Sequence, residues 1–254
     1  MIVAAIKGEL SIGLPDAIIH CDTQWERKAS IEIKKYYTVW FESHGIPVID
    51  TTAGNIKQLG AEEHIHIPFF TQDGGPLQRQ CTRHFKIDPA KKSMREFAGY
   101  HPSKPPHPKP GQFINWLGYS ADEFGRMRND GPKYQKKVYP LIKHGIHRWE
   151  SIAAFDRWEL PTPVRSACLC CPYRKASEWL ELKQQSPQEF REAVEFDKAN
   201  RHNPLAESGG STTSALYIWN GLIPLDEVDF EAEAKKEREN PQYVIAACFE
   251  GCFT

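Results

Sequence analysis

The sequence predicts an α/β protein in which a parallel sheet flanked by helices is followed by a helical, cysteine-bearing C-terminal part. Residues 16–22 form a short apolar run that ends in Asp22, as expected of a buried parallel strand that reaches a ligand-facing sheet edge. Apolar side chains then keep helical spacing over residues 33–44, and Gly45 supplies a C-terminal cap. Residues 46–50 form a second apolar strand, so the three segments together predict a βαβ unit.

Three further segments complete the predicted sheet domain. Residues 53–75 contain four glycines and are expected to form a loop. Residues 76–98 are expected to be helical, with a break at Asp88-Pro89, where the aspartate would cap a new helix that begins with proline. Residues 112–119 form another strand.

The C-terminal part is predicted to be mostly helical, so we divide the chain into residues 1–150 and residues 151–254. Residues 205–214 are rich in Gly, Ser and Thr and are expected to form a loop. The predicted helices of this part cover residues 148–158, 176–185, 187–202 and 230–239.

Composition favours a soluble, cytoplasmic protein. Hydrophobic residues make up 40% of the 254 residues, the mean hydropathy is -0.56, and no apolar run approaches the ~18 residues that a membrane span needs. The N-terminus lacks the pattern of a signal peptide. In the cytoplasm, seven cysteines are expected to be metal-bound, catalytic or simply reduced rather than disulfide-bonded.

The clustered cysteines predict a metal centre. Cys168 and Cys171 have the C-x-x-C spacing that lets two thiolates reach one ion from a tight loop. Cys81, Cys248 and Cys252 are the further candidate ligands, whereas Cys21 lies in an apolar run, where a thiol is usually a small buried hydrophobe. Zinc and a [4Fe-4S] cluster both accept four thiolates, and the spacing alone does not choose between them.

A local excess of positive charge marks residues 79–95, although the net charge of the whole chain is only -1. Six basic residues and one acidic residue give this segment a net charge of +5. Arg79, Arg83 and Lys86 are the candidates to bind a phosphate or sulfate group, because such anions pair well with guanidinium and ammonium groups. A solvated helix face is the alternative explanation for the same charges.

The order of three motifs resembles the phosphoadenosine phosphosulfate (PAPS) reductase-like family of the PP-loop, adenine nucleotide α-hydrolase-like superfamily. The motifs are Cys21-Asp22-Thr23-Gln24-Trp25-Glu26 after a strand, Gln80-Cys81-Thr82-Arg83-His84-Phe85-Lys86, and Cys168-x-x-Cys171. The resemblance implies a HUP/Rossmann-like sheet. It also implies that Asp22, Thr23 and Glu26 lie near an adenine nucleotide such as ATP, although Gln24 replaces the usual glycine.

The second motif resembles the C-C-R-x-R-K run of the iron–sulfur sulfonucleotide reductases, which implies a [4Fe-4S] cluster. Thr82 interrupts the cysteine pair, so a fourth ligand must come from Cys170, Cys248 or Cys252, or be absent. Zinc stays the alternative metal.

Two other segments are compared with the same family. Ser120 and Glu123 form a capping box that opens a helix with Arg126 and Arg128, and these two arginines resemble a family segment that lines the nucleotide pocket. Surface ion pairing is the alternative role for both arginines. The family's Ser-Gly-Gly-x-x-Ser phosphate loop is missing, and residues 2–10 look like the end of the helix that follows it. We expect the first strand and this loop to lie upstream of Met1; loss of ATP chemistry is the alternative.

The resemblance implies one of two reactions. Either ATP adenylates a substrate that a sulfur or nitrogen nucleophile then attacks, or the thiolate of Cys252, in a tail that resembles the reductases' E-C-G, attacks a bound sulfonucleotide. The expected partners are an adenine nucleotide and a sulfur-donor protein or nucleic acid. The rival hypothesis is a non-catalytic protein that binds nucleic acid or another partner and holds a structural zinc.

Overall fold

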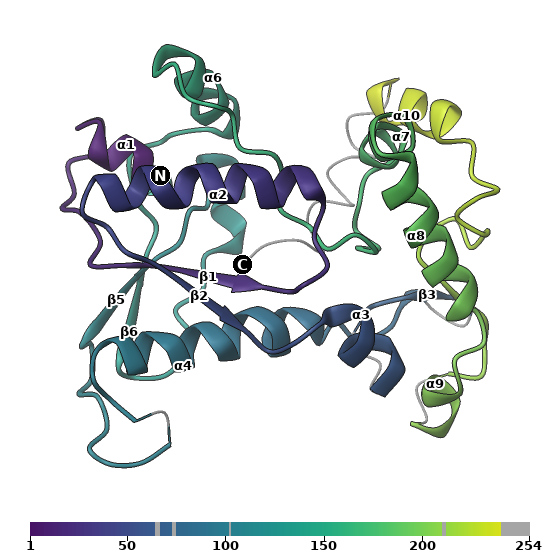
Figure 1. Ribbon diagram of the computed structural model, residues 1–254, viewed down its shortest axis with the longest axis horizontal. Helices are drawn as coiled ribbons and strands as arrows, with labels where there is room; N and C mark the ends of the chain where they lie inside the picture. Colours follow the sequence, from purple (N-terminus) through teal and green to yellow (C-terminus); the bar gives the residue numbers. More distant parts are fainter. Residues whose placement is uncertain (64–66, 73–74, 102, 210–211, 240–254) are drawn as a thin grey trace. The chain divides into compact units, whose positions relative to one another are not determined.

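The computed structural model describes residues 1–63, 67–72, 75–101, 103–209 and 212–239 (Figure 1). The chain forms two compact units that are interleaved in sequence rather than divided at residue 150. Unit 1 comprises Met1–His20, Glu32–Thr51 and Ala90–Val164. Unit 2 comprises Cys21–Ile31, Thr52–Pro89 and the chain from Arg165 onward.

The protein is a mixed α/β structure with short parallel sheets. Strands β1 (Ile18–Asp22) and β2 (Val48–Thr52) form one two-stranded parallel sheet, and helix α2 (Lys28–Ser43) connects them. Strands β5 (Phe113–Trp116) and β6 (Gln135–Val138) form the other, with Phe113 opposite Gln135. The strands expected at residues 16–22, 46–50 and 112–119 are therefore present, whereas β6 lacks a continuous apolar run and was not predicted.

Two helices of unit 1, η3 (Ala121–Arg126) and α6 (Arg148–Arg157), begin at capping boxes. Helix η3 opens at the predicted capping box of Ser120 and Glu123. Asp122 in turn accepts a hydrogen bond from the backbone N–H of Arg148, the first residue of α6, at 2.7 Å. Leu10 and Leu141 lie in the buried core of the unit. The unit 1 helices are α1 (Ile2–Ile6), η3, α5 (Pro140–Lys143) and α6, and most of α2 and of α4 (Asp88–Phe97) also belongs to this unit.

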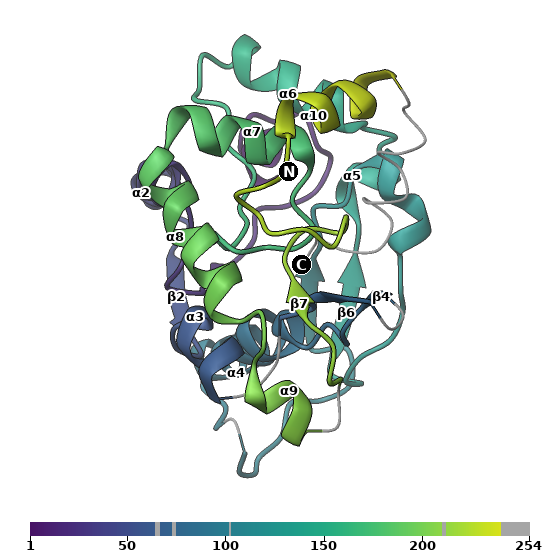
Figure 2. The ribbon, with the colours of Figure 1, turned by 90° about the vertical axis from the view of Figure 1, so that its right-hand side faces the viewer.

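Unit 2 has a helical core around Trp179, which is fully buried. Helix α7 (Ala176–Gln185) packs against α10 (Phe230–Glu239), and α8 (Pro187–Ala199) follows α7 after a turn (Figure 2). All three helices were predicted, α10 as a charged helix. Glu237 of α10 accepts the backbone N–H of Ala176 at 2.8 Å, and so caps the start of α7.

Several unit 2 elements differ from the prediction. The segment expected to be a loop contains α3 (Ile56–Gln58) and the π-helical turn η1 (Leu59–Glu63), because Asn55 caps the first turn through the N–H of Lys57 at 2.8 Å. The break expected at Asp88-Pro89 is a change of helix type without a gap: the π-helical η2 (Arg83–Ile87) ends there and α4 begins at Asp88. Pro89 lies in the first turn of α4, where proline needs no N–H partner.

Unit 2 also contains short elements that join distant parts of the chain. Strand β3 (Phe70–Thr71) lies between β4 (Gly75–Pro76) and β7 (Leu216–Tyr217) in a three-stranded antiparallel sheet. Helix α9 (Pro204–Ser208) overlaps the start of residues 205–214, which were expected to form a loop. In the part of the chain that the structure describes, no helix has the length and apolar character required to cross a membrane.

Candidate functional site: a cysteine-lined cavity

The cysteine loop is joined to the segment that follows β1. The backbone N–H of Leu169 donates to the carbonyl of Trp25 at 2.9 Å, and Cys168 forms an isolated β-bridge with Glu26. The Cys168 thiol lies 3.6 Å from the hydroxyl of Thr23, which is fully buried. Two motifs that are far apart in sequence, the Asp22–Glu26 segment and the C-x-x-C loop, thus lie side by side in unit 2.

A small cavity of about 60 Å³ lies against this loop. Cys81, Cys168 and Cys171 all line it, together with Arg79 and Lys86. One water needs roughly 10–15 Å³ of such space, so the cavity has room for about four to six waters or for an ion. The remaining lining residues are Ile56, Ile67, Pro68, Thr82, Phe85, Ser166, Ala167, Cys170, Pro172 and Tyr173.

The cavity wall contains an unsatisfied polar group. The hydroxyl of Thr82 is buried and has no hydrogen-bond partner among the described residues. A buried hydroxyl without a partner is costly, so it favours a polar occupant of the cavity such as water or an ion. Thiols of three cysteines beside such a group are a donor set that suits a soft metal.

Burial favours the protonated form of two of the cavity thiols, those of Cys168 and Cys81. It raises the pKa of Cys168 to about 12, and the neighbouring Cys171 and Cys81 add to this shift while Lys86 opposes it. Burial also raises the pKa of Cys81, against the effect of Arg79. Metal binding must therefore displace thiol protons, and the uncharged thiols are weak nucleophiles at neutral pH.

The other two described cysteines have different surroundings. Cys170 is 1% exposed and packs in the hydrophobic core with Leu169 and Trp179, and its burial raises its pKa well above the ordinary value. Cys21 was expected to be a small buried hydrophobe. It is instead partly exposed and donates from its thiol to the carbonyl of Lys86 at 3.1 Å, beside the cavity wall. The apolar run around Cys21 gave no sign of this contact.

The metal centre itself stays a prediction. Among the described residues, no three Cys, His, Asp or Glu side chains already stand in metal-ligating geometry. Two candidate ligands, Cys248 and Cys252, lie outside the described residues. The prediction that Cys252 acts as a nucleophile falls on the same part of the chain.

The basic candidates of residues 79–95 separate into two groups. Arg79 and Lys86 line the cavity, and the guanidinium of Arg79 lies 5.4 Å from the centroid of the Tyr173 ring. The side chain of Arg83 is 77% exposed and pairs with Asp88 at 3.4 Å. The Arg83 side chain thus lies on a solvated helix face, which was the alternative explanation for the charges of this segment.

The two remaining arginine candidates belong to unit 1. Arg126 pairs with Glu123 and lies 4.2 Å from the centroid of the Tyr119 ring. One Nη atom of Arg128 donates to the carbonyls of Gly125 and Met127, at 3.0 and 2.9 Å. Both side chains therefore stabilise the local turn around η3.

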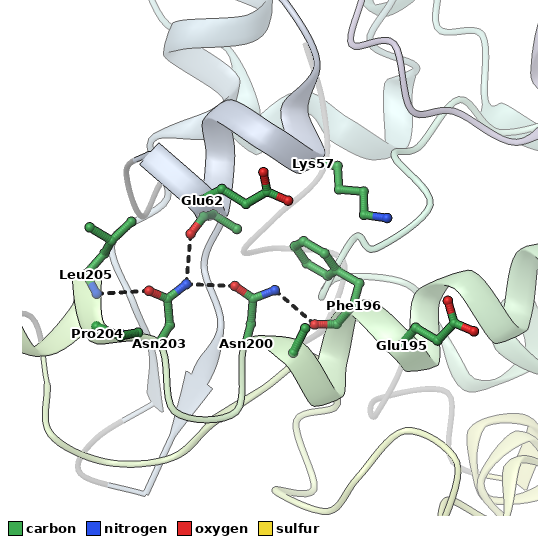
Figure 3. Close-up of a pocket in the computed structure, with 10 residues that line it drawn as sticks. Lys57, Glu62, Glu195, Phe196, Asn200, Asn203, Pro204 and Leu205 are labelled. Carbon is green, nitrogen blue, oxygen red and sulfur yellow. Dashed lines mark hydrogen bonds between the residues drawn. The ribbon is translucent and has the colours of Figure 1, made fainter.

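A separate pocket of unit 2, of about 600 Å³, lies between η1, α8 and α9 (Figure 3). Its buried amides bond to the protein itself. Asn203 donates to the carbonyl of Ala61 at 2.8 Å and to Asn200 at 2.7 Å, and accepts the N–H of Leu205 at 2.9 Å. These bonds leave the amides committed to joining α8, α9 and η1, so the pocket has a structural explanation, whereas the smaller cysteine cavity contains the reactive groups.

Comparison with known proteins adds no assignment to these observations. The chain matches no protein-family model, no curated protein and no solved structure.

Proposed function

We propose that this protein is a PAPS reductase-like member of the PP-loop superfamily, with a HUP/Rossmann-like arrangement of its strands. In this proposal it uses an adenine nucleotide in sulfur-transfer or sulfonucleotide chemistry, and its cysteine cavity holds a thiolate-bound metal centre. One observation carries the proposal: Cys81, Cys168 and Cys171 line one cavity with Arg79 and Lys86, beside the segment that contains Asp22, Thr23 and Glu26.

The residues have distinct roles in this proposal. Cys81, Cys168 and Cys171 supply three thiolates, and a fourth ligand comes from Cys248 or Cys252 or from a non-protein group. When bound, the metal centre supplies either structural support or sulfur-linked redox chemistry, depending on whether it is zinc or [4Fe-4S]. Arg79 and Lys86 bind the phosphate or sulfate group of the nucleotide through charge-assisted hydrogen bonds.

The metal centre is tested by anaerobic purification followed by iron, zinc and sulfide analysis. Wild-type protein is expected to contain either about four iron and four sulfide or about one zinc per chain. Cys81→Ala, Cys168→Ala and Cys171→Ala should each abolish the metal, because each removes a ligand. Cys170→Ala is the matched control, since Cys170 packs in the core, and it should keep the metal. Full metal content in any of the first three variants would refute the ligand set.

The nucleotide site is tested by calorimetric titration with ATP. Arg79→Ala and Lys86→Ala should each weaken ATP binding about tenfold or more, because a hydrogen bond to a charged group contributes roughly 1.5–3 kcal/mol. Arg83→Ala is the matched control from the same segment, and its affinity should be unchanged because its side chain faces solvent. Equal effects in all three variants would indicate only a general effect of charge.

A second candidate function is a non-catalytic protein that binds nucleic acid and holds a structural zinc. The observation that favours it is the charge of residues 91–148 of unit 1, which contain twelve Lys or Arg but four Asp or Glu. Phe124 within this segment and Trp149 immediately after it are also strongly exposed. One zinc per chain, no iron and no ATP binding would support this candidate over the first.

A further inference from the structure

A buried arginine lies directly behind the cysteine loop. Arg174 is only 5% exposed, and its guanidinium donates to the carbonyl of Cys168 at 3.2 Å. The backbone N–H of the same residue donates to the carbonyl of Cys171 at 3.1 Å. Its guanidinium also lies 5.0 Å from the ring centroid of the buried Trp179. Arg174 therefore holds both ends of the C-x-x-C turn.

This arginine lacks the carboxylate that its neighbours have. Buried Arg27 pairs with Glu181 at 3.0 Å, and Arg165 pairs with Glu178. For Arg174, no carboxylate lies within 4.0 Å among the described residues, and its Nε has no hydrogen-bond partner there. An uncompensated buried charge strongly destabilises a folded protein, so the position calls for an anion.

The cysteine loop can supply such an anion, because Arg174 contacts it at the carbonyls of both Cys168 and Cys171. Neutral thiols provide no negative charge. A divalent ion held by three or four thiolates, by contrast, has a net charge of about -1 or -2.

We propose that Arg174 is the buried counter-cation of a thiolate-held metal centre at Cys168 and Cys171. The inference rests on the metal centre of the proposed function and assigns Arg174 as a positioning residue. Its guanidinium holds the loop through the Cys168 carbonyl and offsets the negative charge that forms when the thiols lose their protons to the metal. In the metal-free protein the Arg174 guanidinium then has no carboxylate or thiolate to balance its charge, and metal binding creates the thiolates that do.

The experiment uses the full chain and Co²⁺, whose thiolate charge-transfer absorption reports binding in competition with a chelator. Arg174→Gln keeps a hydrogen-bond donor but loses the charge, and it should weaken Co²⁺ binding by about tenfold to a hundredfold, the range typical of groups that support metal ligands. Arg174→Lys keeps the charge and should lose less than Arg174→Gln. Arg27→Gln is the matched control, because Arg27 is equally buried but has its own carboxylate; its Co²⁺ affinity should match that of wild type.

Thermal unfolding separates this role from a merely structural one. Without metal, Arg174→Gln should unfold at the same temperature as wild type or higher, because it removes an unpaired charge; with Co²⁺ bound, it should unfold at a lower temperature. A structural arginine would lower both temperatures. Failure of metal-free Arg174→Gln to fold, or a Co²⁺ affinity within twofold of wild type, would refute the role of Arg174 alone. Absence of Co²⁺ binding by wild type would refute the metal centre itself.

Discussion

Trp179→Ala is expected to lower the free energy of unfolding of unit 2 by about 3–5 kcal/mol, as for other large aromatic residues removed from a core. Trp179 is fully buried at the centre of the unit 2 core. Its ring stacks on Phe230 of α10 with a centroid distance of 6.1 Å and meets Phe190 of α8 edge-on at 6.4 Å. Alanine would leave a cavity among α7, α8 and α10 that these helices cannot close without moving.

Urea denaturation in the presence of a chelator measures this loss without a contribution from bound metal. Trp149→Ala is the matched control, because the Trp149 side chain in α6 is 68% exposed, and it should change the free energy of unfolding by less than about 0.5 kcal/mol. Similar denaturation midpoints for the two variants would contradict the assignment of Trp179 to the core.

Asp197→Ala is expected to cost a comparable amount, about 3–5 kcal/mol, because it breaks a buried ion pair and leaves its partners unsatisfied. Asp197 in α8 is 1% exposed and pairs with Arg201, which lies just after the C-terminal end of the helix. The same carboxylate accepts the backbone N–H groups of Ile218 at 2.9 Å and Leu225 at 3.1 Å. One side chain therefore fastens the segment after β7 to α8.

The matched control for Asp197 is Asp226, which pairs with Lys198 near the same helix but is more exposed. Asp226→Ala should cost no more than about 1 kcal/mol, as is usual for a surface ion pair. Asp197→Asn should fall between the two alanine variants, because the amide keeps one oxygen acceptor. The ranking is measured from urea midpoints, and a loss for Asp226→Ala as large as that for Asp197→Ala would overturn the explanation.

The sequence was sufficient for elements whose signals are local. Helix α2 has regular apolar spacing, α10 is a charged helical segment, and the Ser120–Glu123 capping box fixes the start of η3. The sequence did not reveal the pairing of β3 with β7. Each strand is only two residues long, so the sequence shows no alternation of apolar and polar residues. Phe70 pairs with Tyr217 because the tertiary fold brings the two segments together.

The candidate site was predictable as a set of motifs but not as an environment. Residue types and spacing were enough to select Cys81, Cys168 and Cys171, which share one cavity. Residue types and spacing could not distinguish Arg79, which lines the cavity, from Arg83, which faces solvent. Packing in the folded protein decides which side of η2, and of the turn before it, faces the cavity. Arg174 gave no signal because it follows a loop and precedes a lysine, where an arginine is normally solvated.

The contacts between the cysteine loop and the β1 end set the order in which the site can be built during translation. They join residues 140 and 145 positions apart, so they form only after most of the chain has left the ribosome. At about 5–20 residues per second, the 90 residues between Cys81 and Cys171 take roughly 5–18 s to synthesise. During that interval the Cys81 thiol is not yet covered by the cysteine loop that completes its cavity. Until then, only a reducing environment protects this thiol from oxidation.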